Sequence, residues 1–194
     1  MADRRIAASI PYAWPWDGGL SPGRTALLVL SAPGGPVLEA LPGELESFAR
    51  ELEHEGGLAL QILTQDPRYR RAPDVPLLPA DRLLGDRVLT AAGLDGFFGS
   101  PLDTVLRRQG RDQLLLAGTW LETSVHSTMR TANDRGYECL LLTDLSPALE
   151  TDLATGAVSC IEMSGGIFGA VSTAAEYLRQ LRRPAADPTD DDCS

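Results

Sequence analysis

Two serines follow segments that the sequence predicts as buried strands, and their hydroxyl groups are the first candidates for chemistry. Ser31 follows the apolar run 25–30, and Ser124 follows the run 114–117 after a turn that begins at Gly118. Ligands of open parallel sheets bind beyond the carboxyl ends of the strands. Backbone N–H groups at the start of the helix after Gly118 can hold a carboxylate or stabilise an oxyanion. A nucleophilic Ser124 would lie close to these N–H groups.

Two ionisable side chains, Glu122 and His126, lie two residues from Ser124 on either side. A carboxylate and an imidazole are common general acids and bases. A structural role is the plainer interpretation of Ser124, and one is also open for Glu122. A serine at a helix start can hydrogen-bond locally, and a carboxylate in the first turn complements the helix dipole. Ser31, as a small residue at a strand end, can either contact a ligand or only fill space.

Hydrophobic patterning predicts strands that alternate with helices along the chain. The predicted strands are 25–30, 58–64, 88–89, 114–117 and 138–143, and the predicted helices are 44–55, 101–109, a segment from the Gly118 turn to about 135, 149–163 and 172–182. Continuous apolar strands are typical of parallel sheets that are buried on both faces. The sequence therefore predicts a doubly wound α/β domain, with a mostly parallel sheet and helices on both faces.

Composition divides the chain into three parts. Residues 1–22 are rich in proline, tryptophan and glycine and predict an ordered N-terminal arm, whose Trp14 and Trp16 should cover apolar surface. Residues 23–183 form the predicted α/β domain. Residues 184–194 are predicted to form an acidic, disordered tail.

The charge balance excludes several classes of function. The 194 residues carry 17 basic side chains, all arginine, and a net charge of −10. The absence of lysine excludes Schiff-base chemistry and a P-loop lysine, and the acidic balance argues against nucleic acid and anionic membranes as partners. Because the first residues lack the apolar core of a secretory signal, we expect a cytoplasmic protein.

Cysteine and histidine usage predicts neither a disulfide framework nor a metal site. Cys139 and Cys160 stand in apolar runs, where buried, inert thiols are expected, and Cys193 falls in the acidic tail. The two histidines, His54 and His126, are far apart in the sequence. We expect no metal and no cofactor.

Several segments resemble one known family. The run from Gly118 to Arg130, continued by 132–139, resembles the signature segment of the isochorismatase-like cysteine hydrolases. Residues 11–18, 96–102 and 165–170 are similar to a subgroup that contains biuret- and ureide-type amidohydrolases. The resemblance implies an isochorismatase-like, Rossmann-like three-layer fold and a homo-oligomer.

The positions that match the family's catalytic triad carry other residues in this chain. The resemblance places the family aspartate at Ser31, the lysine at Ala91 or Ala92, and the nucleophilic cysteine at Ser124. A serine hydroxyl is a weaker acid than a thiol and needs a base, yet the base position is Ser31. Hydrolysis by the family's cysteine mechanism is therefore not expected.

The resemblance also indicates a strand-end pocket for a small molecule. Its expected walls are Phe97, Phe98, Thr119 and Trp120, and the bond between Thr119 and Trp120 is often cis in the family. Because a histidine two places after the nucleophile position is common in the subgroup, the resemblance favours a structural role for His126.

Three functions follow from these observations. The first, which we favour, is a pseudoenzyme that binds a small molecule or supports a partner, such as a catalytic paralogue. The second is a repurposed enzyme of specialised metabolism, which performs a cyclisation, elimination or isomerisation with Glu122, His126, Ser31 and Ser124 around Trp120. The third is an amide or ureide hydrolase that uses Ser124 as its nucleophile.

Overall fold

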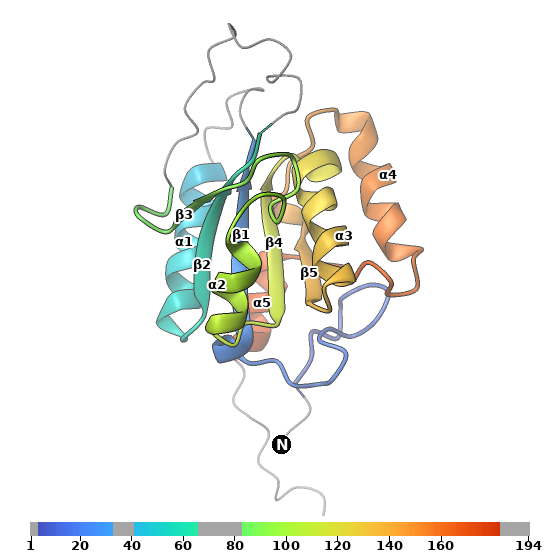
Figure 1. The fold of residues 1–194 in the computed structure, drawn as a ribbon. Helices are drawn as coiled ribbons and strands as arrows, with labels where there is room; N and C mark the ends of the chain where they lie inside the picture. The colour runs from blue at the N-terminus through green and yellow to red at the C-terminus, as the bar shows by residue number, and fades with distance from the viewer. Residues whose placement is uncertain (1–3, 33–40, 66–82, 183–194) are drawn as a thin grey trace, which may run out of the picture.

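The computed structural model describes residues 4–32, 41–65 and 83–182, and it confirms the doubly wound α/β architecture. Six parallel strands form one sheet in the order β3-β2-β1-β4-β5-β6 (Figure 1). The strands are β1 (Thr25–Ser31), β2 (Leu58–Leu63), β3 (Val88–Thr90), β4 (Gln113–Thr119), β5 (Glu138–Leu142) and β6 (Ala170–Ser172). The strand order reverses between β1 and β4, so the crevice for ligands is expected at the carboxyl ends of these two strands.

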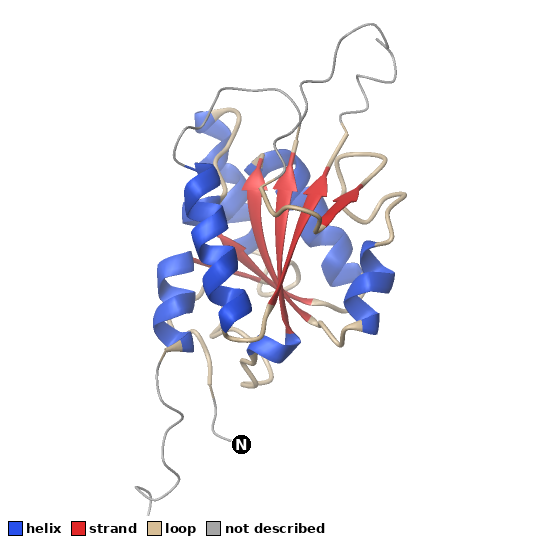
Figure 2. Ribbon diagram, turned by 90° about the vertical axis from the view of Figure 1, so that its left-hand side faces the viewer, coloured by secondary structure: helices blue, strands red, loops and turns tan. Residues whose placement is uncertain are grey.

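Helices cover both faces of the sheet (Figure 2). They are α1 (Leu41–His54), α2 (Leu102–Arg108), α3 (His126–Asp134), α4 (Thr151–Glu162) and α5 (Ala174–Leu181). One apolar core lies between the sheet and α2, α3 and α4, and the other lies between the sheet and α1, α5 and the N-terminal arm. The central strands β1 and β4 are buried along almost their whole length, because both of their faces contribute to a core.

The structure describes the N-terminal arm from residue 4 onward. Trp14 is fully buried and its ring lies 6.4 Å from that of Tyr177 on α5. Ile10 forms an antiparallel bridge with Val171 of β6, in which each backbone N–H donates to the other residue's carbonyl. The expectation for Trp16 is wrong, because 69% of this residue is exposed.

Four other expectations need correction or fall outside the described residues. β6 was not predicted, because three residues are too few to show a periodicity, and the last helix accordingly begins later, after its N-cap Thr173. Cys160 is exposed, since it lies on the outer side of α4, whereas Cys139 is buried. The chain enters α3 through a π-helical turn, Leu121–Val125, instead of a continuous α-helix. The acidic tail, 184–194, lies outside the described residues.

Candidate functional site

At the carboxyl ends of β1, β2 and β4, Ser31 and Ser124 belong to two pairs of neutral polar side chains, and the Thr64 hydroxyl links the pairs by donating to the backbone carbonyl of Ser31 at 3.4 Å. The Ser124 hydroxyl is fully buried and lies 3.1 Å from the hydroxyl of Thr64, which follows β2. Gln61 donates from Nε2 to the Ser31 hydroxyl at 2.9 Å and accepts at Oε1 from the backbone of Leu83. In the described part of the chain, no carboxylate or imidazole hydrogen-bonds the side chain of Ser31 or Ser124. We call these four side chains (Ser31, Gln61, Thr64 and Ser124) the hydroxyl centre.

The turn after β4 positions Ser124 through an unusually close approach to β1. Gly118 has a φ of +104°, and a Cβ atom placed there would lie 2.0 Å from the carbonyl oxygen of Leu30. The peptide bond between Thr119 and Trp120 is cis, as the resemblance suggested. The Thr119 hydroxyl accepts a hydrogen bond from the backbone N–H of Ala32, and Trp120 is 5% exposed. Thr119 therefore belongs to the contact between β4 and β1.

Glu122 does not contact the hydroxyl centre in the described residues. Its carboxylate accepts hydrogen bonds from the backbone N–H groups of Leu149 and Glu150 at 2.9 to 3.2 Å. These groups directly precede α4, so Glu122 satisfies backbone donors at the start of that helix. The Glu122 carboxylate thus complements the N-terminus of a helix. That helix is α4, whereas the prediction placed the carboxylate at the start of its own helix.

His126 also lies apart from the hydroxyl centre. Its ring meets that of Phe168 edge-on, with 6.4 Å between the ring centroids, and its Nε2 atom is buried without a hydrogen-bond partner among the described residues. Burial, with a smaller contribution from the charge of Arg130, lowers the pKa of His126. The neutral imidazole is therefore the favoured form in the folded chain.

This lowered pKa predicts that acid weakens the fold through His126. Between the ordinary histidine pKa of about 6.5 and the lower folded value, the unfolded chain binds more protons, so the free energy of unfolding falls as the pH drops through that window. We expect His126→Gln to lose part of this pH dependence in urea denaturation between pH 7.5 and 5. His54→Gln is the matched control, because 85% of the His54 side chain is exposed. An unchanged pH slope in His126→Gln would contradict the prediction.

The predicted wall residues Phe97 and Phe98 lie in different environments. Phe97 is 5% exposed and packs 5.8 Å from the ring of Tyr137. Phe98 is 55% exposed, and its carbonyl accepts a hydrogen bond from the backbone of Ala92. Ala91, the other position that matches the family lysine, is fully buried. Both alanines offer only a methyl group where the family carries an ammonium group.

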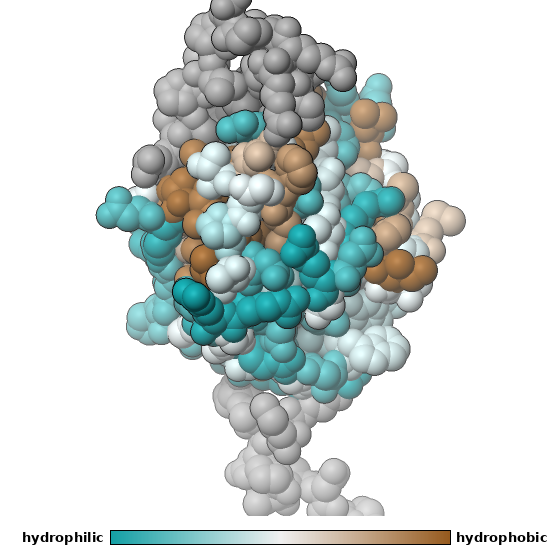
Figure 3. All heavy atoms as spheres, in the orientation of Figure 1, coloured by the Kyte–Doolittle hydropathy of each residue, from teal (hydrophilic) through white to brown (hydrophobic). Residues whose placement is uncertain are grey.

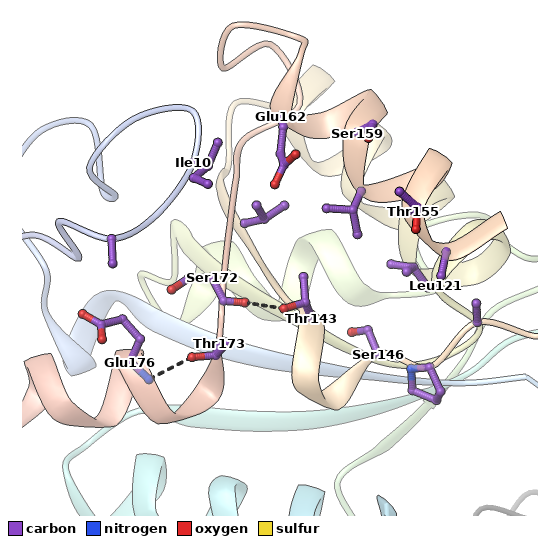
Figure 4. Close-up of a pocket in the computed structure, with 16 residues that line it drawn as sticks. Ile10, Leu121, Thr143, Ser146, Thr155, Ser159, Glu162, Ser172, Thr173 and Glu176 are labelled. Atoms are coloured by element: carbon purple, nitrogen blue, oxygen red, sulfur yellow. Dashed lines mark hydrogen bonds between the residues drawn. The ribbon is translucent and has the colours of Figure 1, made fainter. Parts of the chain in front are cut away.

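A cavity of about 760 Å³, which the sequence did not predict, lies between α4, β6, the turn after β5 and the N-terminal arm (Figure 4). We call it the α4 cavity. Its lining is Ala8, Ile10, Leu121, Thr143, Ser146, Pro147, Ala148, Ala154, Thr155, Val158, Ser159, Glu162, Val171, Ser172, Thr173 and Glu176. None of the residues proposed from the sequence as pocket walls or catalytic groups belongs to this lining. Leu121, in the turn that carries Ser124, belongs to this lining and so joins the two regions.

The described residues contain neither a metal-binding cluster nor a membrane-spanning helix. Across 4–32, 41–65 and 83–182, no group of three or more histidine, cysteine, aspartate or glutamate side chains could hold a metal ion. In the same ranges, no helix combines the length and the apolar character needed to cross a membrane.

Comparison with known proteins points to one family. The profile of the isochorismatase domain matches residues 69–176, which is more than half of the chain. The chain is similar to the uncharacterized isochorismatase family protein YwoC of Bacillus subtilis, with 29% identity over 70% of this chain and 74% of that protein. It is also 35% identical to ureidoacrylate amidohydrolase RutB of Methylorubrum extorquens, over half of this chain but only 38% of RutB.

Solved structures share the fold. An isochorismatase family protein from Burkholderia thailandensis superposes with a TM-score of 0.68 at 24% identity, over 84% of this chain and 98% of that protein. The nicotinamidase SaPncA from Staphylococcus aureus superposes with a TM-score of 0.59 at 16% identity, over 78% of this chain and 99% of that protein.

Proposed function

Because the chain belongs to the isochorismatase family, we propose that it is a cytoplasmic, non-hydrolytic member of that family whose function is to bind a small molecule. The observation that carries the proposal is the composition of the hydroxyl centre. Ser124 is buried and paired with the hydroxyl of Thr64, and Ser31 accepts from the amide of Gln61. All these groups are neutral and none is a base in water, so within the described residues the centre contains no group that could ionise a serine hydroxyl.

The test is hydrolysis with three forms of the full chain. We expect wild type, Ser124→Ala and Ser124→Cys to hydrolyse a ureide, biuret and an aromatic amide no faster than the uncatalysed reaction in buffer. Ser124→Cys belongs in the set because a thiol without a neighbouring base or cation is only a few per cent ionised at neutral pH. Circular dichroism of each form controls for folding. Turnover by wild type that Ser124→Ala abolishes would assign a serine hydrolase, and turnover that survives in Ser124→Ala would assign another hydrolytic site; both overturn the proposal.

Support of a partner is the second candidate, favoured by apolar side chains exposed on and around α4. Leu153 is 53% exposed, Met163 86% and Ile167 71%. Figure 3 shows apolar surface at the right-hand side of the molecule, where α4 and the turn after it lie. Such a patch is typical of protein interfaces. The partner would be a second copy of this chain, in line with the expected homo-oligomer, or a catalytic paralogue.

A further inference from the structure

We propose that the α4 cavity binds a small organic amine, with its ammonium group at Glu162, an apolar body along the middle of the cavity and a hydrogen-bonding group at Ser146. The inference rests on the binding part of the proposed function and names the class of ligand. It does not depend on the absence of hydrolysis.

The size and the lining of the cavity suit a small molecule with an apolar body. A volume of about 760 Å³ falls in the range of ligand sites, roughly 300 to 1,000 Å³. Its middle is apolar, with Leu121, Val158 and Val171 among the lining residues. Such sites usually combine an apolar body with a few polar groups that fix the ligand's orientation.

The charges around the cavity favour a cationic ligand. Among the described residues, the lining contains two carboxylates and no arginine or histidine. Glu176 forms an ion pair with Arg179, whereas the side chain of Glu162 has no ion pair or hydrogen bond within the described residues. Figure 4 shows the Glu162 carboxylate pointing from the end of α4 toward the cavity. A net charge of −10 on the whole chain adds a field that attracts cations and repels anions.

Ser146 supplies the second polar contact. It is only 3% exposed, and its Oγ atom is buried with no hydrogen-bond partner in the part of the chain that the structure describes. A buried hydroxyl without a partner is unfavourable, so a ligand group that donates to it or accepts from it gains that interaction on binding. Glu162 and Ser146 lie on opposite sides of the cavity in Figure 4, which places the two polar ends of the ligand apart.

Four related probes separate these contributions in isothermal titration calorimetry of the full chain. Tyramine has an ammonium group, a ring and a hydroxyl group. Tyrosol replaces the ammonium group with a neutral hydroxyl, 3-(4-hydroxyphenyl)propionate replaces it with an anion, and phenethylamine lacks the phenol. We expect tyramine to bind at least about tenfold more tightly than tyrosol, since charge-assisted hydrogen bonds are the strong ones, and the propionate to show no binding.

Variants test the two contacts separately. Glu162→Gln should weaken tyramine about tenfold and leave tyrosol unchanged, while Glu44→Gln, at an exposed position on α1 outside the cavity lining, should change neither. Ser146→Ala should weaken tyramine and not phenethylamine. Ala154→Phe, which fills the cavity, should remove all binding. Thermal unfolding of each variant confirms that it folds, and Glu162→Ala, which also removes the carboxylate, replaces Glu162→Gln if that variant does not.

The outcomes that overturn the proposal are distinct from those that overturn the absence of hydrolysis. Equal affinity for tyramine and tyrosol, or no binding of any probe, would overturn the ligand class even if no substrate is hydrolysed. Hydrolysis that depends on Ser124, together with tyramine binding that depends on Glu162, would overturn only the non-hydrolytic assignment. A dimer in sedimentation equilibrium that Ala154→Phe dissociates, with no probe bound, would assign the cavity to a second copy of the chain and overturn the proposal.

Discussion

Gly118→Ala is expected to lose about 4 kcal/mol or more of the free energy of unfolding, which is a large part of the roughly 5 to 15 kcal/mol that stabilises a typical domain. Two effects combine at this position. A φ of +104° disfavours any residue with a Cβ atom. The added methyl group would also lie 2.0 Å from the carbonyl oxygen and 2.8 Å from the nitrogen of Leu30, both in the backbone of β1. Since Leu30 pairs with Gly118 in the sheet, relief of this overlap would separate the two central strands.

The measurement is urea denaturation of Gly118→Ala beside Gly136→Ala. Gly136 has a φ of +82°, but nothing lies within 4 Å of a Cβ atom placed there. The control therefore carries the backbone penalty of about 1 to 2 kcal/mol without the steric overlap. If the two variants unfold at the same urea concentration, the steric overlap with β1 does not contribute to the effect of Gly118→Ala, and the prediction is contradicted.

Trp14→Ala is expected to lower the free energy of unfolding by about 3 to 5 kcal/mol, the usual range for loss of a large aromatic side chain from a core. Trp14 is fully buried and lies against Tyr177, in the core formed with α1 and α5. The arm that it anchors also contributes Ala8 and Ile10 to the α4 cavity. We therefore expect this single change to weaken tyramine binding as well as the fold.

Trp16→Ala is the matched control for the arm. This tryptophan lies two residues away but is 69% exposed, so its loss should change the free energy of unfolding by no more than about 0.5 kcal/mol. Chemical denaturation of both variants, followed by calorimetry with tyramine, provides the comparison. A Trp14→Ala protein as stable as Trp16→Ala would mean that the arm contributes little to the core.

The sequence predicted those parts of the fold that depend on local pattern. The apolar runs identified β1, β2, β4 and β5, because a strand buried on both faces is apolar throughout its length. β6 was not predicted, because its three residues become a strand only by pairing with Leu140 to Leu142 of β5. That pairing depends on the tertiary fold and leaves no local signal.

The candidate site was predictable to a smaller extent. The topology of parallel strands placed Ser31 and Ser124 at one end of the sheet. Their actual partners, Gln61 and Thr64, depend on the register between β1 and β2, which the sequence alone does not fix. The α4 cavity had no sequence signal, since its lining comes from the arm, α4 and β6, segments that are far apart in the chain.

The bridge between Ile10 and Val171 has a consequence for the behaviour of the protein in solution. β6 is the last strand on its side of the sheet, and the backbone groups on its outer side would otherwise be open to another chain. Ile10 occupies the hydrogen-bonding groups of Val171, the middle residue of this three-residue strand. The arm thus blocks strand addition from a neighbouring molecule, and a chain that lacks its first residues up to Ile10 should aggregate through β6.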